Sequence, residues 1–260
     1  MLVRAILGVV LASSIAVAAR KTRSLSTSGA AAATVVGAIA VAAGWSWGAL
    51  LIIYFASSTA LSHLGRATKE QRTATIVAKS GERDAVQVLA NGLLFTVAAA
   101  GMLVHADIRW IALGGGSLAA SAADTWATEI GTLYGGQPRS LLTWKIVPVG
   151  TSGGISLLGT LAAVAGALFV AAVAVLLGWP LVVSGYIALG GIAGAMLDSL
   201  LGDSAQARRW CETCKRETER HIHDCGAATA PRRGLQWLDN DLVNFISSAA
   251  GGLLAAMLSR

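Results

Sequence analysis

Eight apolar segments, most of them close to 20 residues long, constrain this 260-residue chain more than any other feature. A helix of about 20 apolar residues crosses the ~30 Å hydrocarbon core of a bilayer. Hydrophobic residues make up 55% of the chain and charged residues only 13%, against about 25% in soluble domains. We therefore predict an all-α, polytopic transmembrane helix bundle. The predicted spans are residues 2–19, 29–43, 45–62, 85–104, 110–131, 154–177, 181–201 and 242–258.

The distribution of Lys and Arg predicts how this bundle sits in the membrane. With eight spans, 17 of the 20 basic residues fall on one face, and only Arg4, Arg109 and Arg260 fall on the other. Basic loops stay in the cytoplasm, so we predict a protein of the cytoplasmic (inner) membrane with both termini outside. The net charge of +6 is thus mainly a topology signal, and we expect no nucleic acid as partner. No linker divides the chain, so residues 1–260 are predicted to form one domain.

The first span has an alternative interpretation as a cleaved signal peptide. Arg4 precedes an apolar stretch that ends in small residues, as it would in such a peptide. However, Arg20, Lys21 and Arg23 follow directly, and a basic cluster at this point resists export. The sequence therefore favours a retained helix.

Four acidic residues fall at the predicted cytoplasmic face: Asp124, Glu129, Asp198 and Asp241. A carboxylate at the centre of a bilayer costs about 2.5 kcal/mol or more, so acids at such depths usually line a polar site. Mg²⁺ prefers oxygen ligands and is commonly held by carboxylates together with substrate phosphates. We predict that these four acids are catalytic and hold Mg²⁺ or orient its waters. The alternatives are ion pairs that fix helix packing, proton coupling in a transporter, and, for Asp241, an N-cap.

Phosphate-binding groups are predicted at the same face. Four spans begin there, and the free N–H groups of helix N-termini bind anions. The Gly-rich run at 150–154 lets a backbone approach a phosphate closely. The alternatives are helix capping by Ser28, Thr151 and Asn240, and a helix–helix hydrogen bond from Asn91. The candidate substrate-binding residues are Ser28, Asn91, Thr125, Arg139, Lys145, Thr151, Ser152, Gly153, Gly154, Ser199, Asn240 and Asn244.

The predicted cytoplasmic loop at residues 203–241 contains every cysteine of the chain. Cys211, Cys214, His223 and Cys225 offer the four nitrogen and sulfur ligands that structural zinc takes. The spacing is not that of a standard zinc finger, and the alternative is a set of reduced cytoplasmic thiols. We predict a small zinc-binding element within this loop, and no stable disulfide.

Several runs of the sequence resemble the transmembrane protein 19-like family. These runs are DTWATEIG at 124–131, PR at 138–139, VPVGTSGG at 147–154, LDSLLG at 197–202 and NDLVN at 240–244, with VLANG at 88–92 and SG at 28–29. That family includes the plant and cyanobacterial phytyl-phosphate kinase of tocopherol synthesis, and many other members have no assigned activity. Asp203 departs from the family pattern, which has a small residue after LDSLLG, so its role is open.

The resemblance and the residues lead to one functional prediction. We expect a membrane kinase that transfers a phosphoryl group from a nucleoside triphosphate, such as CTP, to an isoprenyl monophosphate such as phytyl or geranylgeranyl phosphate. Lipid and nucleotide would meet at the cytoplasmic face. The alternatives are a lipid nucleotidyl or phospho-alcohol transferase, and a transporter or flippase of lipid phosphates or ions. A transporter needs a polar path to the outer face, and the outer halves of the spans that begin at 85, 154 and 242 are almost wholly apolar.

Overall fold

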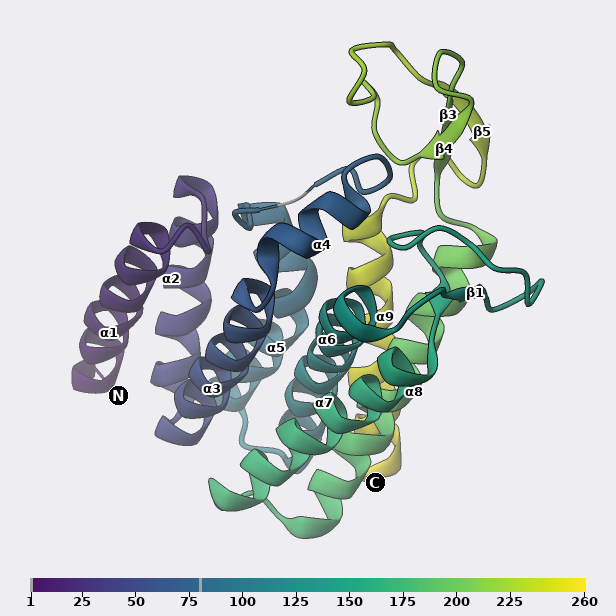
Figure 1. Ribbon diagram of the computed structural model, residues 1–260. Helices are drawn as coiled ribbons and strands as arrows, with labels where there is room; N and C mark the ends of the chain where they lie inside the picture. The colour runs from purple at the N-terminus through teal and green to yellow at the C-terminus, as the bar shows by residue number, and fades with distance from the viewer. Residues whose placement is uncertain (1, 80) are drawn as a thin grey trace.

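The computed structural model describes residues 2–79 and 81–260, and most of these residues form long helices that lie side by side (Figure 1). The helices are α1 (Leu2–Lys21), α2 (Thr27–Ala43), α3 (Trp45–His63), α4 (Arg66–Thr73), α5 (Ala85–Val104), α6 (Ile108–Tyr134), α7 (Leu157–Leu176), α8 (Leu181–Ser204) and α9 (Asn240–Leu258). The strands are β1 (Arg139–Ser140), β2 (Gly154–Ile155), β3 (Arg208–Cys211), β4 (Arg216–Thr218) and β5 (Ala230–Arg233). Each predicted span coincides with one long helix, and the short helix α4 was not predicted.

Five helices, α1, α5, α7, α8 and α9, are long and apolar enough to cross a membrane. A sixth span results if α3 and α4, which meet at a bend of 72°, are counted as one. Helix α2 has only 17 residues, and α6 carries polar side chains in its second half. The membrane-spanning helical class is therefore confirmed, whereas the number of eight spans stays a prediction.

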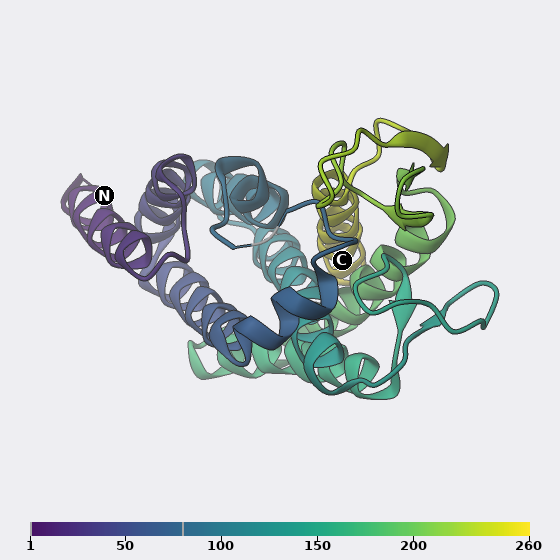
Figure 2. The ribbon, with the colours of Figure 1, turned by 45° about the horizontal axis from the view of Figure 1, so that its top comes forward.

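Both termini lie at one end of the bundle, and α4 and all five strands lie at the other (Figure 1). We call the second end the loop face. Helices α2, α5, α7 and α9 begin at this face, so four helix N-termini point toward it, as predicted. Figure 2 shows α4, the β1 segment and residues 208–233 arranged over the loop-face ends of the helices. The side of the membrane on which the loop face lies stays a prediction.

The helix caps differ from those considered in the sequence. The Ser26 side chain accepts a hydrogen bond from the Gly29 N–H and caps α2, and Ser156 caps α7 in the same way. Asp239 accepts from the N–H of Leu242 at 3.0 Å and caps α9. Ser28, Thr151, Asn240 and Asp241 are therefore not N-caps, and the capping interpretation of these residues is wrong.

Helix α6 lies in the middle of the bundle and owes this position to small residues. Residues 112–123 of α6 are all buried, and most are Gly, Ala or Ser. A Cβ at Gly116 would lie 2.7 Å from the Cβ of Ala255, and one at Gly190 would lie 2.3 Å from the carbonyl oxygen of Gly251. Small residues thus let α6, α8 and α9 approach closely, which is how helices gain packing energy in lipid. Because α6 is covered by protein rather than lipid, it tolerates a lower hydropathy.

Residues 208–233 form a small lobe, which we call the Cys/His lobe. Strands β3, β4 and β5 form an antiparallel sheet in the order β4-β3-β5. The prediction of an all-α fold is therefore right for the bundle and wrong for this lobe. Outside the lobe, β1 and β2 also pair as a short antiparallel sheet. The lobe is bound to the segment before α5, because the Glu219 N–H donates to the Ile76 carbonyl at 2.8 Å and Arg220 Nε donates to the Val77 carbonyl at 2.8 Å.

Candidate functional site

Asp124 on α6 and Asp198 on α8 lie close enough to interact at the loop-face ends of these two packed helices. Within residues 2–79 and 81–260, no ion pair joins either acid to a Lys or Arg. The Oδ2 atom of Asp198 is buried and has no hydrogen-bond partner among the described residues. Two adjacent carboxylates repel each other, and an unpaired buried oxygen is unfavourable. The pair thus offers unsatisfied oxygen ligands that suit a cation.

Glu129, one helical turn further along α6, has a different environment. Its Oε1 accepts a hydrogen bond of 2.6 Å from the Ser62 hydroxyl, and its Oε2 pairs with Lys69 Nζ. Lys69 is itself buried and also donates to the carbonyls of Leu61 and Ser62. Arg83 donates to the Ser62 hydroxyl at 3.0 Å and extends this network. For Glu129, the interpretation as one half of an ion pair is therefore confirmed.

Asp241, at the start of α9, is also paired. Its Oδ2 lies 2.6 Å from Lys79 Nζ, which lies 2.9 Å from Asp84 Oδ2 as well. Asp241 is buried, whereas Lys79 is 45% exposed in its side chain. Asp84 also caps α5 in a capping box with Gln87. Lys79 thus links the start of α5 to the start of α9 and keeps an exposed side beside the site.

The Gly-rich run forms a tight loop against the end of α8. Gly150 and Gly153 have φ values of +90° and +73°, which disfavour a residue with a side chain. A Cβ at Gly153 would lie 2.3 Å from the backbone nitrogen of Asp203. Glycine is therefore needed here for packing against α8, a reason that differs from the predicted approach to a phosphate. Asp203 fixes the neighbouring segment, because its Oδ2 accepts from Ser140 Oγ at 2.6 Å and from the Leu142 N–H at 2.9 Å.

Glu219 of the Cys/His lobe reaches this loop and was missed in the sequence. Its carboxylate accepts hydrogen bonds from the Ser152 hydroxyl and from Gln206 Nε2. Arg208 binds the same loop through the Ser152 carbonyl, at 2.6 Å. Burial raises the pKa of the Glu219 carboxyl above its usual range. The acids at the ends of apolar spans were found from their position along the span. Glu219 lies in a polar loop, where hydropathy does not indicate whether a side chain faces the site.

A cavity of about 870 Å³ brings these groups together at the loop face. Most of the predicted site residues line it: Asn91, Asp124, Thr125, Glu129, Thr151, Ser152, Gly153, Gly154, Asp198, Ser199, Asn240, Asp241 and Asn244. Six basic residues line it as well: Arg23, Arg66, Lys69, Lys79, Arg83 and Arg209. In the sequence analysis these basic residues served only to predict topology. The cavity therefore combines two unpaired acids with a basic lining that suits phosphates.

Three predicted residues lie outside this lining. Ser28 forms a hydrogen bond with the Ser26 hydroxyl and accepts one from the Ala85 N–H at 3.3 Å. Arg139 is exposed and donates to the Trp144 carbonyl at 2.9 Å, and Lys145 is exposed beside it.

Asn91 does line the cavity, and its side chain donates to the Gln87 carbonyl of its own helix at 3.0 Å. Among the described residues its side chain makes no hydrogen bond to a neighbouring helix, so this alternative for Asn91 is not supported.

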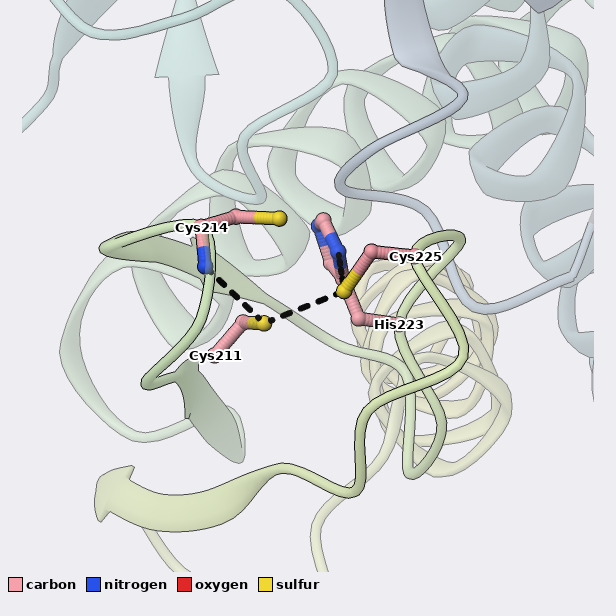
Figure 3. Close-up of side chains that lie close together, drawn as sticks. All are labelled: Cys211, Cys214, His223 and Cys225. Carbon is pink, nitrogen blue, oxygen red and sulfur yellow. Dashed lines mark hydrogen bonds between the residues drawn. The ribbon is translucent and has the colours of Figure 1, made fainter.

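The four predicted zinc ligands gather at one point of the Cys/His lobe (Figure 3). One ligand atom from each of Cys211, Cys214, His223 and Cys225 lies within 4.8 Å of the others. Cys211 Sγ lies 3.7 Å from Cys225 Sγ, too far for a disulfide. His223 Nδ1 lies 2.6 Å from Asp224 Oδ1 and 3.3 Å from Cys225 Sγ, and Nε2 is buried with no hydrogen-bond partner among the described residues. A carboxylate on one nitrogen of a metal-binding His is common, so this donor set fits zinc.

The fold and these sites define a class: a helical integral membrane protein with an acidic site at one face of its bundle. Residues 10–252 match the family described as integral membrane protein DUF92, and the chain belongs to this family. The family resemblance expected from the sequence is therefore confirmed.

Curated relatives from two organisms extend this comparison. Protein PGR of Arabidopsis thaliana is 30% identical, over 98% of this chain and 96% of its own length. Protein VTE6, chloroplastic, of the same plant is 29% identical, over 91% of this chain and 66% of its own length. An uncharacterised membrane protein of Synechocystis is 29% identical, over 86% of this chain and 78% of its own length. No solved structure matches the chain.

Proposed function

We propose that this protein is a membrane phosphotransferase that transfers a phosphoryl group from a nucleoside triphosphate, such as CTP, to an isoprenyl monophosphate and yields the diphosphate. The observation that carries this proposal is the Asp124–Asp198 pair, which has no basic partner in the described ranges and lies in a cavity lined by basic side chains. Kinship with VTE6 and the resemblance to the phytyl-phosphate kinase family support the same substrate class.

Asp124 and Asp198 are the residues we propose for Mg²⁺. Their carboxylates are the hard oxygen donors that this ion prefers, and Asp198 Oδ2 has no other partner in the part of the chain described. Bound Mg²⁺ would neutralise charge on the transferring phosphates. Glu129 and Asp241, predicted as further Mg²⁺ ligands, are now proposed to position Lys69 and Lys79 beside the substrate instead.

The reaction requires little acid–base chemistry from the protein. An oxygen of the lipid monophosphate attacks the γ-phosphorus of the nucleotide, the bond between this phosphorus and the β-phosphate oxygen breaks, and a nucleoside diphosphate leaves. The attacking phosphate is already anionic, so no strong base is needed. We propose that Lys79 and Arg83, at the cavity wall, bind the phosphates and stabilise the charge that moves onto the leaving group.

An apolar core beneath the site favours an enzyme over a transporter. The buried side chains of the bundle include Trp47, Phe95, Leu118, Val170 and Ile187 and form one apolar cluster. Along this cluster an ion or a headgroup would meet mainly apolar side chains, and the buried polar side chains of the bundle are chiefly hydroxyl groups, such as those of Thr96, Ser117 and Ser184. A lipid nucleotidyl or phospho-alcohol transferase would use the same acids and basic residues, and the mass of its product would differ.

The direct test is the product that purified protein forms with Mg²⁺, a nucleoside triphosphate and a panel of isoprenyl monophosphates. We expect an isoprenyl diphosphate and a nucleoside diphosphate in equal amounts by mass spectrometry. A nucleotidylated lipid would assign the transferase alternative. Absence of any product, together with transport of the lipid phosphate across proteoliposome membranes, would contradict the proposal.

We also propose that the loop face lies in the cytoplasm. Leu142, two residues after β1, and Ala106, between α5 and α6, are exposed at opposite ends of the bundle. With an impermeant thiol reagent on intact cells, we expect Ala106→Cys to be labelled and Leu142→Cys to be labelled only after lysis. The reverse pattern would place the site outside the cell.

We propose, finally, that the cluster of Cys211, Cys214, His223 and Cys225 holds a structural zinc ion. The metal would fix the Cys/His lobe, and with it the position of Glu219 against the Gly-rich loop. Elemental analysis of protein purified without a His tag is expected to find one zinc per chain. Absence of zinc from folded protein would contradict this proposal and leave the alternative of reduced thiols.

A further inference from the structure

A second cavity, apolar and about 110 Å³ in volume, lies among α1, α2, α3 and α5. Its lining is formed mainly by aliphatic and aromatic side chains: Leu11, Ile15, Leu25, Val36, Val41, Leu51, Ile52, Tyr54, Phe55 and Val88. The phosphoryl-transfer site as described makes no use of it. We call this cavity the apolar groove.

The groove adjoins the polar cavity. Arg83, Gln87, Asn91 and Thr125 line both. Thr125 follows Asp124 directly in α6, so one end of the groove opens beside the acid pair. Away from these four residues the lining becomes apolar, and Leu11 at its edge is 42% exposed on the outer surface of the bundle. The groove therefore leads from the phosphate site to a surface that lipid would cover.

We propose that the apolar groove binds the isoprenoid chain of the substrate while the phosphate lies beside Asp124 and Asp198. This inference rests on the proposed function and adds to it the path of the lipid tail. A chain with a charged head and an apolar tail needs a polar and an apolar compartment that meet, and the four shared residues mark that junction. The tail otherwise lies in bilayer hydrocarbon, which is as apolar as the groove, so selection for chain length would come from how well the chain fits and packs in the groove.

Gly92 offers a place to narrow the groove. It lies on α5 in the groove lining, and a Cβ there would make an ordinary contact of 3.7 Å with Val36. Gly92→Ala therefore fits, whereas the longer side chain of Gly92→Leu would extend into the groove. Gly185 on α8 is the matched control, because a Cβ there meets nothing within 4 Å and the residue is outside the groove.

The first experiment compares kcat/KM for geranyl, farnesyl, geranylgeranyl and phytyl phosphates. We expect Gly92→Leu to lose at least about tenfold on the two longest chains relative to geranyl phosphate, because its side chain occupies space that the longer chains need, and Gly92→Ala to lose less. Gly185→Leu should keep the profile of the wild type. An equal loss on all chain lengths, or none, would overturn the inference.

The second experiment does not depend on turnover and so separates the groove from the proposed function. Protein in nanodiscs is irradiated with an isoprenyl phosphate that carries a diazirine at its tail, and the modified peptides are mapped. We expect labels on α1 and α3 near Ile15 and Phe55, reduced in Gly92→Leu, even if no transfer activity is found. Labels spread over the whole lipid-facing surface, as for a bulk membrane lipid, would contradict a tail site.

Discussion

Two pairs of acids lie in the same cavity, and their surroundings differ. Glu129 and Asp241 each contact a lysine, Lys69 and Lys79 respectively. Asp124 and Asp198 contact each other and have no basic partner within residues 2–79 and 81–260. An acid paired with a base is satisfied by the protein alone, whereas two adjacent carboxylates repel each other unless they share a proton or bind a cation. The same residue type therefore serves architecture in one pair, whereas in the other pair we propose that it binds a cation.

The largest effect is expected where the unpaired acids are neutralised. Asp124→Asn or Asp198→Asn should lower kinase activity by about 10³-fold or more, because the proposed Mg²⁺ site is lost. The melting temperature in detergent should stay the same or rise, because repulsion between the carboxylates is removed. Asp107→Asn, the same change at a half-buried N-cap on the opposite face, is the control; it should leave activity unchanged and lower the melting temperature slightly, because the ion pair with Arg109 is lost. If Asp198→Asn unfolds while its folded fraction keeps full turnover, Asp198 stabilises the fold and does not act in catalysis.

The opposite behaviour is expected for a paired acid. Glu129→Gln leaves the buried ammonium of Lys69 without its counter-ion and should destabilise the fold by about 3 kcal/mol. The double variant Glu129→Gln with Lys69→Met should regain much of this loss. Glu70→Gln, which breaks the exposed Arg66–Glu70 pair, should change stability by less than about 0.5 kcal/mol. These free energies are measured by unfolding in detergent. Equal effects of Glu129→Gln and Glu70→Gln would mean that burial makes no difference here.

The Cys/His cluster extends the comparison to a second set of unsatisfied ligands. Cys214→Ser, or removal of metal by a chelator, should destabilise the lobe by about 2 kcal/mol or more and increase hydrogen exchange in β3–β5, while the bundle helices keep their protection. Thr213→Ser is the neighbouring control. A lobe that stays protected after complete metal removal would show that the sheet folds without zinc.

Glu219 is an intermediate case, a buried acid held by neutral donors, and the smallest effect is expected there. Its raised pKa means that folding favours the protonated form. Its contribution to stability is therefore complete below the ordinary value of 4.5 and is lost as the pH rises through the raised pKa. Glu219→Gln should flatten this dependence in melting curves between about pH 4 and pH 8. An unchanged slope would assign the pH dependence to other groups.

The sequence allowed good predictions where one local property decides the outcome. Hydropathy placed all eight long helices, and depth brought Asp124, Asp198 and Asn244 to one face. Sequence patterns did not predict the contacts between segments that are distant in the chain. Lys69 reaches Glu129 only because the chain bends by 72° between α3 and α4, and no local pattern reports that bend. For α2 and α9, capping was missed by one or two residues for a similar reason, since several polar residues precede each helix and only geometry selects Ser26 or Asp239.

The close packing of α6, α8 and α9 also determines which part of the molecule can move. Glycine at 116, 190 and 251 brings backbone against backbone, so these helices cannot slide without clashes. By contrast, only 22% of the span window of α1 is buried, against 44% for α8. If the proposed lipid substrate enters and leaves this protein, we expect α1 and its neighbours to move, while α6 and α8 act as a fixed frame. Turnover in such a protein would leave the spacing of Asp124 and Asp198 unchanged through every opening and closing of the lipid path.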